Sequence, residues 1–135
     1  MAMTDHPRRS VIAVVDDDQG MLESIESLLN SADYEVRLFS TATALLESGS
    51  LHDIDCLISD VAMPLMDGCE LARAAQAARP ALPVILVTGR PDLLRRSPLD
   101  GPNHYRVFKK PFDGQELLTA VALMLPTPRP RAPRS

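Results

Sequence analysis

An acidic triplet directly follows the first apolar run of the chain. The aspartates Asp16 to Asp18 come immediately after five apolar residues in the sequence VIAVVDDD. Neighbouring carboxylates repel each other by about 1 kcal/mol in water and by several times that at a partly buried site. A hard divalent cation with oxygen ligands relieves such repulsion. We therefore expect a positive charge beside this triplet.

Three further groups complete a set that is suited to phosphoryl transfer. Asp60 and Thr88 end two other apolar runs, and the only two lysines, Lys109 and Lys110, stand immediately before Pro111 in a chain with twelve arginines. Mg²⁺ needs one or two carboxylates and keeps positions open for phosphate oxygens. Phosphoryl transfer requires mainly positioning and charge neutralisation, which Mg²⁺, one lysine and one hydroxyl supply. In this interpretation Asp60 is the nucleophile.

Each of these groups alone also has an ordinary structural explanation. Aspartate is common at helix N-termini, so the triplet also fits a helix cap. Thr88 is a β-branched residue typical of strands, and paired lysines often mark a solvated strand end. Because adjacent strand residues point to opposite faces, only one of Lys109 and Lys110 can reach a shared site. The functional interpretation depends on the fold bringing these groups together.

Strands and helices are predicted to alternate along the chain. Five apolar or alternating runs are typical of strands and cover residues 11–15, 35–39, 56–58, 84–87 and 105–108. Helical spacing of apolar residues predicts helices at 21–29, 69–78 and 115–124, and a short helix capped by Ser40 that runs through Leu46. Parallel strands need such crossover helices. The pattern predicts an α/β fold with a doubly wound, five-stranded parallel sheet of the flavodoxin-like type.

The predicted strand order brings the candidate site residues to one edge of the sheet. The alternating run 35–39 suits an edge strand and favours the order 2-1-3-4-5. Ligands of such sheets bind beyond the carboxyl ends of the strands, where the order reverses. The residues expected at that edge are two paired carboxylates, a third carboxylate, a hydroxyl and an ammonium group, namely Asp16, Asp17, Asp60, Thr88 and one of Lys109 and Lys110.

Four motifs in this order resemble the receiver domain of two-component response regulators. They read VVDDD, LISDVAMPLMDG, VILVTGR and FKKPF, with intervals of 44 residues from Asp16 to Asp60, 28 to Thr88 and 22 to Lys110. The chain is similar to receivers that precede LuxR-type helix-turn-helix domains. The resemblance implies a CheY-like fold that takes a phosphoryl group from a sensor histidine kinase or phosphotransfer protein. The phosphorylated domain would then switch conformation to control a partner or output domain.

The resemblance also implies a role for each motif residue. Asp60 would accept the phosphoryl group, Lys110 would contact that group, Thr88 would move toward it, and Lys109 would face solvent. The implied Mg²⁺ ligands are two carboxylates, one backbone carbonyl and one carboxylate that acts through water: Asp17, Asp60, the Ala62 carbonyl and Asp16. Autocatalytic phosphorylation and dephosphorylation of the aspartate would be the only chemistry, so we do not expect an enzyme.

The sequence departs from this family in two places. An aromatic residue usually stands three positions before the lysine, but here that position is Val107, with Tyr105 two residues earlier on the same strand face. The segment 91–104 contains three prolines and a glycine where the family has a regular fourth helix. We predict an irregular or shortened helix there, with at most a turn around 92–97. The family meets output partners on the face of this helix, the fifth strand and the last helix, so we expect an unusual partner.

Two other classes of protein share part of this pattern. Hydrolases of the haloacid-dehalogenase type use a similar aspartyl nucleophile, hydroxyl, lysine and acidic pair. They require a second aspartate two residues after the nucleophile, where this chain has Ala62. A phosphate-independent interaction module that keeps only the receiver fold is the second alternative. Val107 and the interrupted segment 91–104 are compatible with that module, whereas the complete set of motif residues argues against it.

The length and composition indicate the number of domains and the class of protein. The chain of 135 residues is long enough for one ordinary domain, and its 45% hydrophobic and 24% charged residues are typical of a globular protein. We expect a flexible N-terminus over 1–9, a receiver domain over 10–125 and a disordered Pro/Arg-rich tail or linker over 126–135. Whether the receiver stands alone or begins a longer regulator is left open by the sequence.

The charge and the cysteine content indicate where the protein works. The net charge is −4, and the last ten residues hold three arginines and no acidic residue. The acidic remainder argues against direct nucleic-acid binding. No apolar run approaches the length of a membrane span or of an export signal. Cys56 and Cys69 are expected to be packing residues in a reducing compartment, so we predict a cytoplasmic protein without membrane association.

Overall fold

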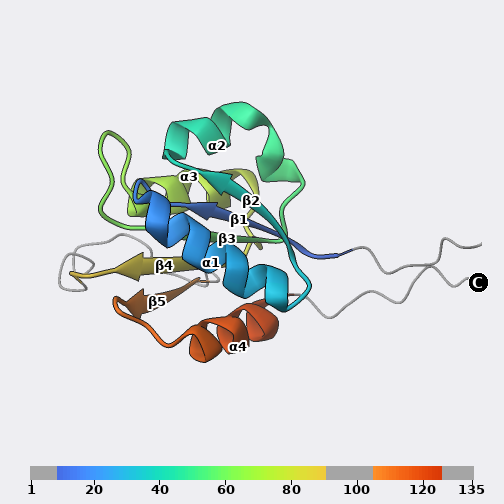
Figure 1. The fold of residues 1–135 in the computed structure, drawn as a ribbon. Coiled ribbons are helices and arrows are strands. Elements are labelled where there is room, and N and C mark those ends of the chain that lie inside the picture. Colours follow the sequence, from blue (N-terminus) through green and yellow to red (C-terminus); the bar gives the residue numbers. More distant parts are fainter. Residues whose placement is uncertain (1–8, 91–104, 126–135) are drawn as a thin grey trace, which may run out of the picture.

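The computed structural model describes residues 9–90 and 105–125, which form one parallel sheet with helices on both faces (Figure 1). The strands are β1 (Val11–Val15), β2 (Glu35–Phe39), β3 (Cys56–Asp60), β4 (Val84–Thr88) and β5 (Tyr105–Lys109). Every neighbouring pair is parallel, and the order is β2-β1-β3-β4-β5. The predicted flavodoxin-like fold and its strand order are confirmed.

Helices cover the two faces of the sheet in pairs. In Figure 1, α1 and α4 lie on one side of the sheet, and α2 and α3 lie on the other. Their bounds, together with those of a short 3-10 helix, are α1 (Gln19–Ser31), α2 (Ala42–Ser48), η1 (Ser50–His52), α3 (Gly68–Ala78) and α4 (Gly114–Met124). The irregular helix predicted within 91–104 lies outside the described residues, as do the terminal segments 1–8 and 126–135.

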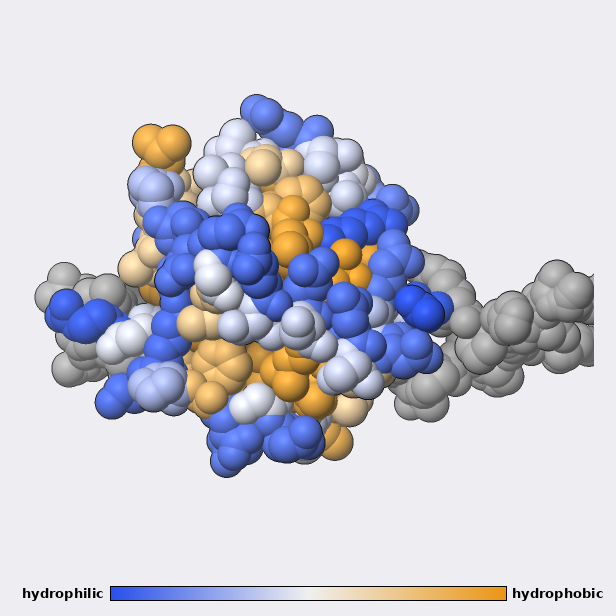
Figure 2. All heavy atoms as spheres, viewed as in Figure 1, coloured by the Kyte–Doolittle hydropathy of each residue, from blue (hydrophilic) through white to orange (hydrophobic). Residues whose placement is uncertain are grey.

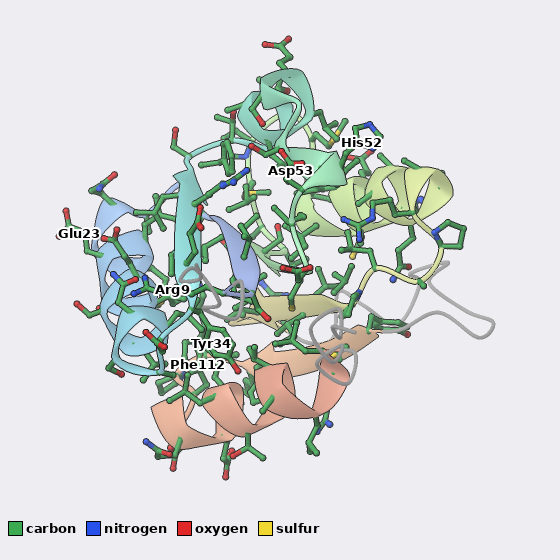
Figure 3. The ribbon with its side chains drawn as sticks, turned by 90° about the vertical axis from the view of Figure 1, so that its right-hand side faces the viewer. Arg9, Glu23, Tyr34, His52, Asp53 and Phe112 are labelled. Carbon is green, nitrogen blue, oxygen red and sulfur yellow. The ribbon has the colours of Figure 1, made fainter. Side chains whose placement is uncertain are left out.

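Side chains of the inner strands alternate between two apolar clusters. In β1, Ile12 and Val14 pack with α1 and α4, whereas Ala13 and Val15 pack with α2 and α3. Tyr34 and Phe112 join the cluster on the α1 and α4 side (Figure 3). All residues of β1, β3 and β4 are buried, because strands covered on both faces need apolar residues at every position.

Both cysteines contribute to this packing. Cys56 is fully buried in the α1 and α4 cluster, and burial raises the pKa of its thiol to about 12. Cys69 packs at the margin of the other cluster. Within residues 9–90 and 105–125, no helix has the length and apolar character needed to cross a bilayer.

Aspartate and threonine side chains fix the starts of the helices. Asp18 caps α1 by accepting a hydrogen bond from the Met21 N–H at 3.2 Å, so one member of the acidic triplet is a helix cap. The expected Ser40 cap of α2 is wrong by one residue. Thr41 is the cap, and its hydroxyl accepts from the Ala44 N–H at 3.0 Å. Both residues can cap a helix, and the path of the backbone after β2 selects the second.

The position of this cap can be tested by substitution. Thr41→Ala should lower the free energy of unfolding by about 1 kcal/mol, because the Ala44 N–H loses its acceptor. Ser40→Ala is the matched control and should change it by less than about 0.5 kcal/mol. Urea unfolding followed by circular dichroism measures both values. Equal losses in the two variants would contradict the assignment of the cap to Thr41.

Candidate functional site

The carboxyl ends of the strands meet at one edge of the sheet, which lies on the left in Figure 1. Val15 of β1 is in register with Ser59 of β3, so Asp16 and Asp60 follow at neighbouring positions. On the other side of β3, Asp60 is paired with Val87, which directly precedes Thr88. The sheet therefore gathers chain segments that lie far apart in the sequence, as the strand order predicted.

A lysine bridges the two buried carboxylates. The Lys110 Nζ lies 3.4 Å from Asp16 Oδ2 and 3.3 Å from Asp60 Oδ1. Asp16 and Asp60 are only 2% and 7% exposed, so both carboxylates need such a partner. Lys109, at the end of β5, is exposed to solvent. Of the two lysines, Lys110 is thus the one that reaches the site.

Burial and neighbouring charges change the pKa values of Asp60 and Lys110. Burial raises the pKa of the Asp60 carboxyl above its ordinary value, the neighbouring Asp16 raises it further, and Lys110 opposes both. For Lys110, burial alone would lower the pKa, but attraction to Asp16 and Asp60 outweighs burial and raises it. The lysine therefore stays protonated, while Asp60 carries a charge that its surroundings disfavour.

The carboxylates offer a set of ligands for a hard cation. One oxygen from each of Asp16, Asp17 and Asp60 can be chosen so that all three lie within 4.8 Å of one another. Asp17 is exposed, which leaves the cluster open on one side. Oxygen ligands with an open side and excess negative charge fit Mg²⁺. Ala62, the remaining predicted ligand, lies in the exposed loop two residues after Asp60.

Thr88 occupies the buried carboxyl end of β4. Its hydroxyl accepts a hydrogen bond from the Arg90 N–H at 2.9 Å, and its carbonyl accepts from the Lys110 N–H at 2.8 Å. The second bond ties the segment that carries the lysine to the strand beside Asp60. On β5, Val107 is 40% exposed, and Tyr105 packs against the α2 and α3 cluster.

Gly68 allows α3 to begin in contact with the backbone of Asp60. The motifs alone did not indicate this role. A Cβ at position 68 would lie 2.2 Å from the Asp60 carbonyl oxygen and 2.9 Å from Val61 Cα. The Gly68 N–H also donates to the Val61 carbonyl at 2.9 Å. Asp67 and Glu70 then cap the helix reciprocally. The Asp-Gly pair before a helix was the available sequence signal.

Comparison with known proteins identifies the class. The family model of the response regulator receiver domain matches residues 12–122. This chain therefore belongs to the response-regulator receiver family, which acts in two-component signalling. Members of this family interact with histidine kinases or phosphotransfer proteins, and they generally bind Mg²⁺ through a cluster of aspartates.

Individual relatives agree with this membership. The response regulator protein TodT of Pseudomonas putida is 35% identical over 130 residues, which cover 94% of this chain and 57% of TodT. The receiver protein CpdR of Brucella abortus is 31% identical, and the match covers 84% of this chain and 95% of CpdR. This chain thus spans a little over half of the length of TodT but nearly all of CpdR.

A solved structure with a similar fold is the signal receiver domain of an HD domain-containing protein from Pseudomonas fluorescens. It superposes with a TM-score of 0.79 at 33% identity, over 87% of this chain and 94% of that domain. This similarity supports the same family membership.

The close approach at Gly68 predicts a large penalty for one added methyl group. Gly68→Ala should lower the free energy of unfolding by about 1–3 kcal/mol, because backbone atoms of Asp60 and Val61 must move. Gly89→Ala is the control, since a Cβ there meets nothing within 4 Å. Denaturant unfolding of both variants measures the difference. A Gly68→Ala protein as stable as Gly89→Ala would contradict the packing described here.

The raised pKa of Asp60 predicts a stability that depends on pH. Such a carboxyl holds its proton more tightly in the folded state, so its contribution to stability falls as pH rises from its unfolded pKa through its folded pKa. Asp60→Asn removes the disfavoured charge and should raise the free energy of unfolding at pH 7. The gain should shrink below about pH 4, where wild-type Asp60 is protonated in both states.

Urea unfolding at pH 7 and at pH 3.5 measures this gain. The control is Asp33→Asn, which removes a carboxylate that is 83% exposed. A stabilisation by Asp60→Asn that is equal at the two pH values would show that charge burial is not its cause.

Proposed function

We propose that Asp60 is the residue through which this receiver takes up a phosphoryl group from a phosphohistidine. A carboxylate oxygen of Asp60 attacks phosphorus, the bond from phosphorus to the imidazole nitrogen breaks, and an acyl phosphate forms. The observation that carries this proposal is the Lys110 Nζ at 3.3 Å from Asp60 Oδ1, at the edge where Asp16 and Asp17 also lie. A nucleophile beside an ammonium group and an acidic cluster has the parts that phosphoryl transfer requires.

Lys110 is proposed to neutralise negative charge both before and after the transfer. Before transfer, its ammonium group neutralises part of the charge on Asp16 and Asp60. After transfer, the Asp60 oxygen carries the phosphoryl group, and the same ammonium group can donate hydrogen bonds to a phosphoryl oxygen. Asp16 holds the lysine in place in both states, because its buried carboxylate lies 3.4 Å from the Lys110 Nζ.

We further propose that Mg²⁺ completes the site. Asp17, Asp60 and the Ala62 carbonyl would hold the ion directly, and Asp16 would hold it through water. The ion supplies charge neutralisation for the phosphoryl oxygens when it is bound. Support comes from the three carboxylates within reach of one another and from the burial and repulsion that raise the Asp60 pKa.

The response to phosphorylation is proposed to start at Thr88. Its hydroxyl would leave the Arg90 N–H and turn toward the phosphorylated Asp60, and the strand end would follow. Val107 on β5 and Leu123 on α4 are exposed apolar residues, which supports an output partner on the face formed by β5 and α4. The helix predicted within 91–104, which belongs to the predicted partner face, lies outside the described residues. We infer a cytoplasmic, non-enzymatic signalling domain that undergoes only its own phosphorylation and dephosphorylation.

Intact-mass measurement after incubation with acetyl phosphate and Mg²⁺ tests the assignment. The wild-type protein should gain one phosphoryl group, Asp60→Asn should gain none, and a chelator should prevent the gain. Lys110→Met should slow the reaction at least about tenfold, because it removes the charge that faces the nucleophile.

Two matched variants separate the site from general effects of charge. Asp33→Asn and Lys109→Met remove an exposed carboxylate and an exposed ammonium group and should react as the wild type does. Absence of any phosphoryl gain in the wild type, together with absence of Mg²⁺ binding by calorimetry, would favour the phosphate-independent interaction module instead.

A further inference from the structure

The loop between β3 and α3 places an apolar side chain in solvent beside the site. Leu65 is 93% exposed, and residues 61–66 (VAMPLM) contain no charged or polar side chain. Figure 2 shows hydrophobic atoms standing out from this loop at the upper left. Ala62 and Pro64 are exposed as well. Leu65, with the exposed Ala62 and Pro64, thus forms an apolar loop tip in water, and an apolar tip beside a functional site can serve as a contact surface.

The backbone of the loop holds Leu65 outward at a conformational cost. Its φ is +68°, in the left-handed region that disfavours a residue with a Cβ and suits glycine or asparagine. On either side of Leu65, Met63 and Met66 pack against the α2 and α3 cluster. The close approach at Gly68 anchors the end of the loop. Leu65 is thus the exposed tip of a loop whose neighbouring residues are held by packing.

The burial of Asp60 determines what must contact this loop. The Asp60 side chain is 8% exposed, so a phosphoryl group carried on a protein side chain must enter from the rim of the site. The surface of the donor protein around that side chain must then contact the loops that surround Asp60. Among the described residues, three large apolar side chains are exposed, and of these Leu65 alone lies in a loop at the carboxyl ends of the strands.

We propose that Leu65 is a docking residue that packs against the surface of the phosphohistidine-bearing protein during transfer. This inference rests on the proposed function of Asp60. Asp17 and Asp18 are exposed carboxylates beside the site and repel a negatively charged phosphorylated donor. An apolar contact supplies attraction that does not depend on charge. A small donor such as acetyl phosphate has no surface to make this contact, so Leu65 serves protein donors specifically.

The test compares two phosphoryl donors on two variants. Leu65→Asn and Leu65→Gly remove the apolar side chain and suit the positive φ, so their melting temperatures should not fall below that of the wild type. Transfer from autophosphorylated histidine-kinase cores, chosen from a panel for transfer to the wild-type chain, should slow about tenfold. Phosphorylation by acetyl phosphate should keep its wild-type rate. Leu123→Gln, which alters a leucine 72% exposed on α4, should leave both rates unchanged.

The outcomes distinguish docking from the chemistry of the site. Unchanged transfer from the kinase cores would overturn the role of Leu65, and so would an equal slowing with both donors. The docking role would also be rejected if no kinase core transfers to the wild type while acetyl phosphate does. Failure of the wild type with every donor would instead reject the proposed function of Asp60.

Discussion

Repulsion between carboxylates at the ends of β1 and β3 is the constraint on which this site depends. Asp16 and Asp60 are both buried, and the parallel pairing of β1 with β3 keeps the two carboxylates close together. Lys110 follows β5, which is two strands away from β3, and its ammonium group lies between the two carboxylates. The sheet therefore holds together charges that would separate in water. Burial raises the pKa of Asp60 and the neighbouring Asp16 raises it further, whereas attraction to Asp16 and Asp60 outweighs burial and raises the pKa of Lys110.

The backbone that follows Asp60 is closely packed as well. α3 begins immediately beside Asp60 at the end of β3, and Gly68 permits that approach. The capping box of Asp67 and Glu70 then fixes the first turn of α3. The loop between them has little freedom, since Met63 and Met66 are held by the α2 and α3 cluster. Leu65 is left in water at a positive φ as a result.

Local patterns in the sequence were sufficient for most of the fold. The continuous apolar runs of β1, β3 and β4 identified strands buried on both faces, and the alternating run 35–39 identified an edge strand. The cap of α2 was predicted one residue too early, at Ser40, because serine and threonine can both cap a helix. Hydrogen-bond chemistry is the same for both residues. The direction in which the chain leaves β2 decides between them, and no local pattern encodes that direction.

The sequence by itself determined which residues could meet, because parallel pairing in the order 2-1-3-4-5 sends the carboxyl ends of the strands to one edge. It also showed that one lysine alone could serve the site, since adjacent strand residues face opposite sides. Only the tertiary structure decided that Lys110 bridges Asp16 and Asp60, and that position 68 has no room for a Cβ. These facts depend on distances of a few ångströms between segments far apart in the chain. Spacing along a sequence cannot specify such distances.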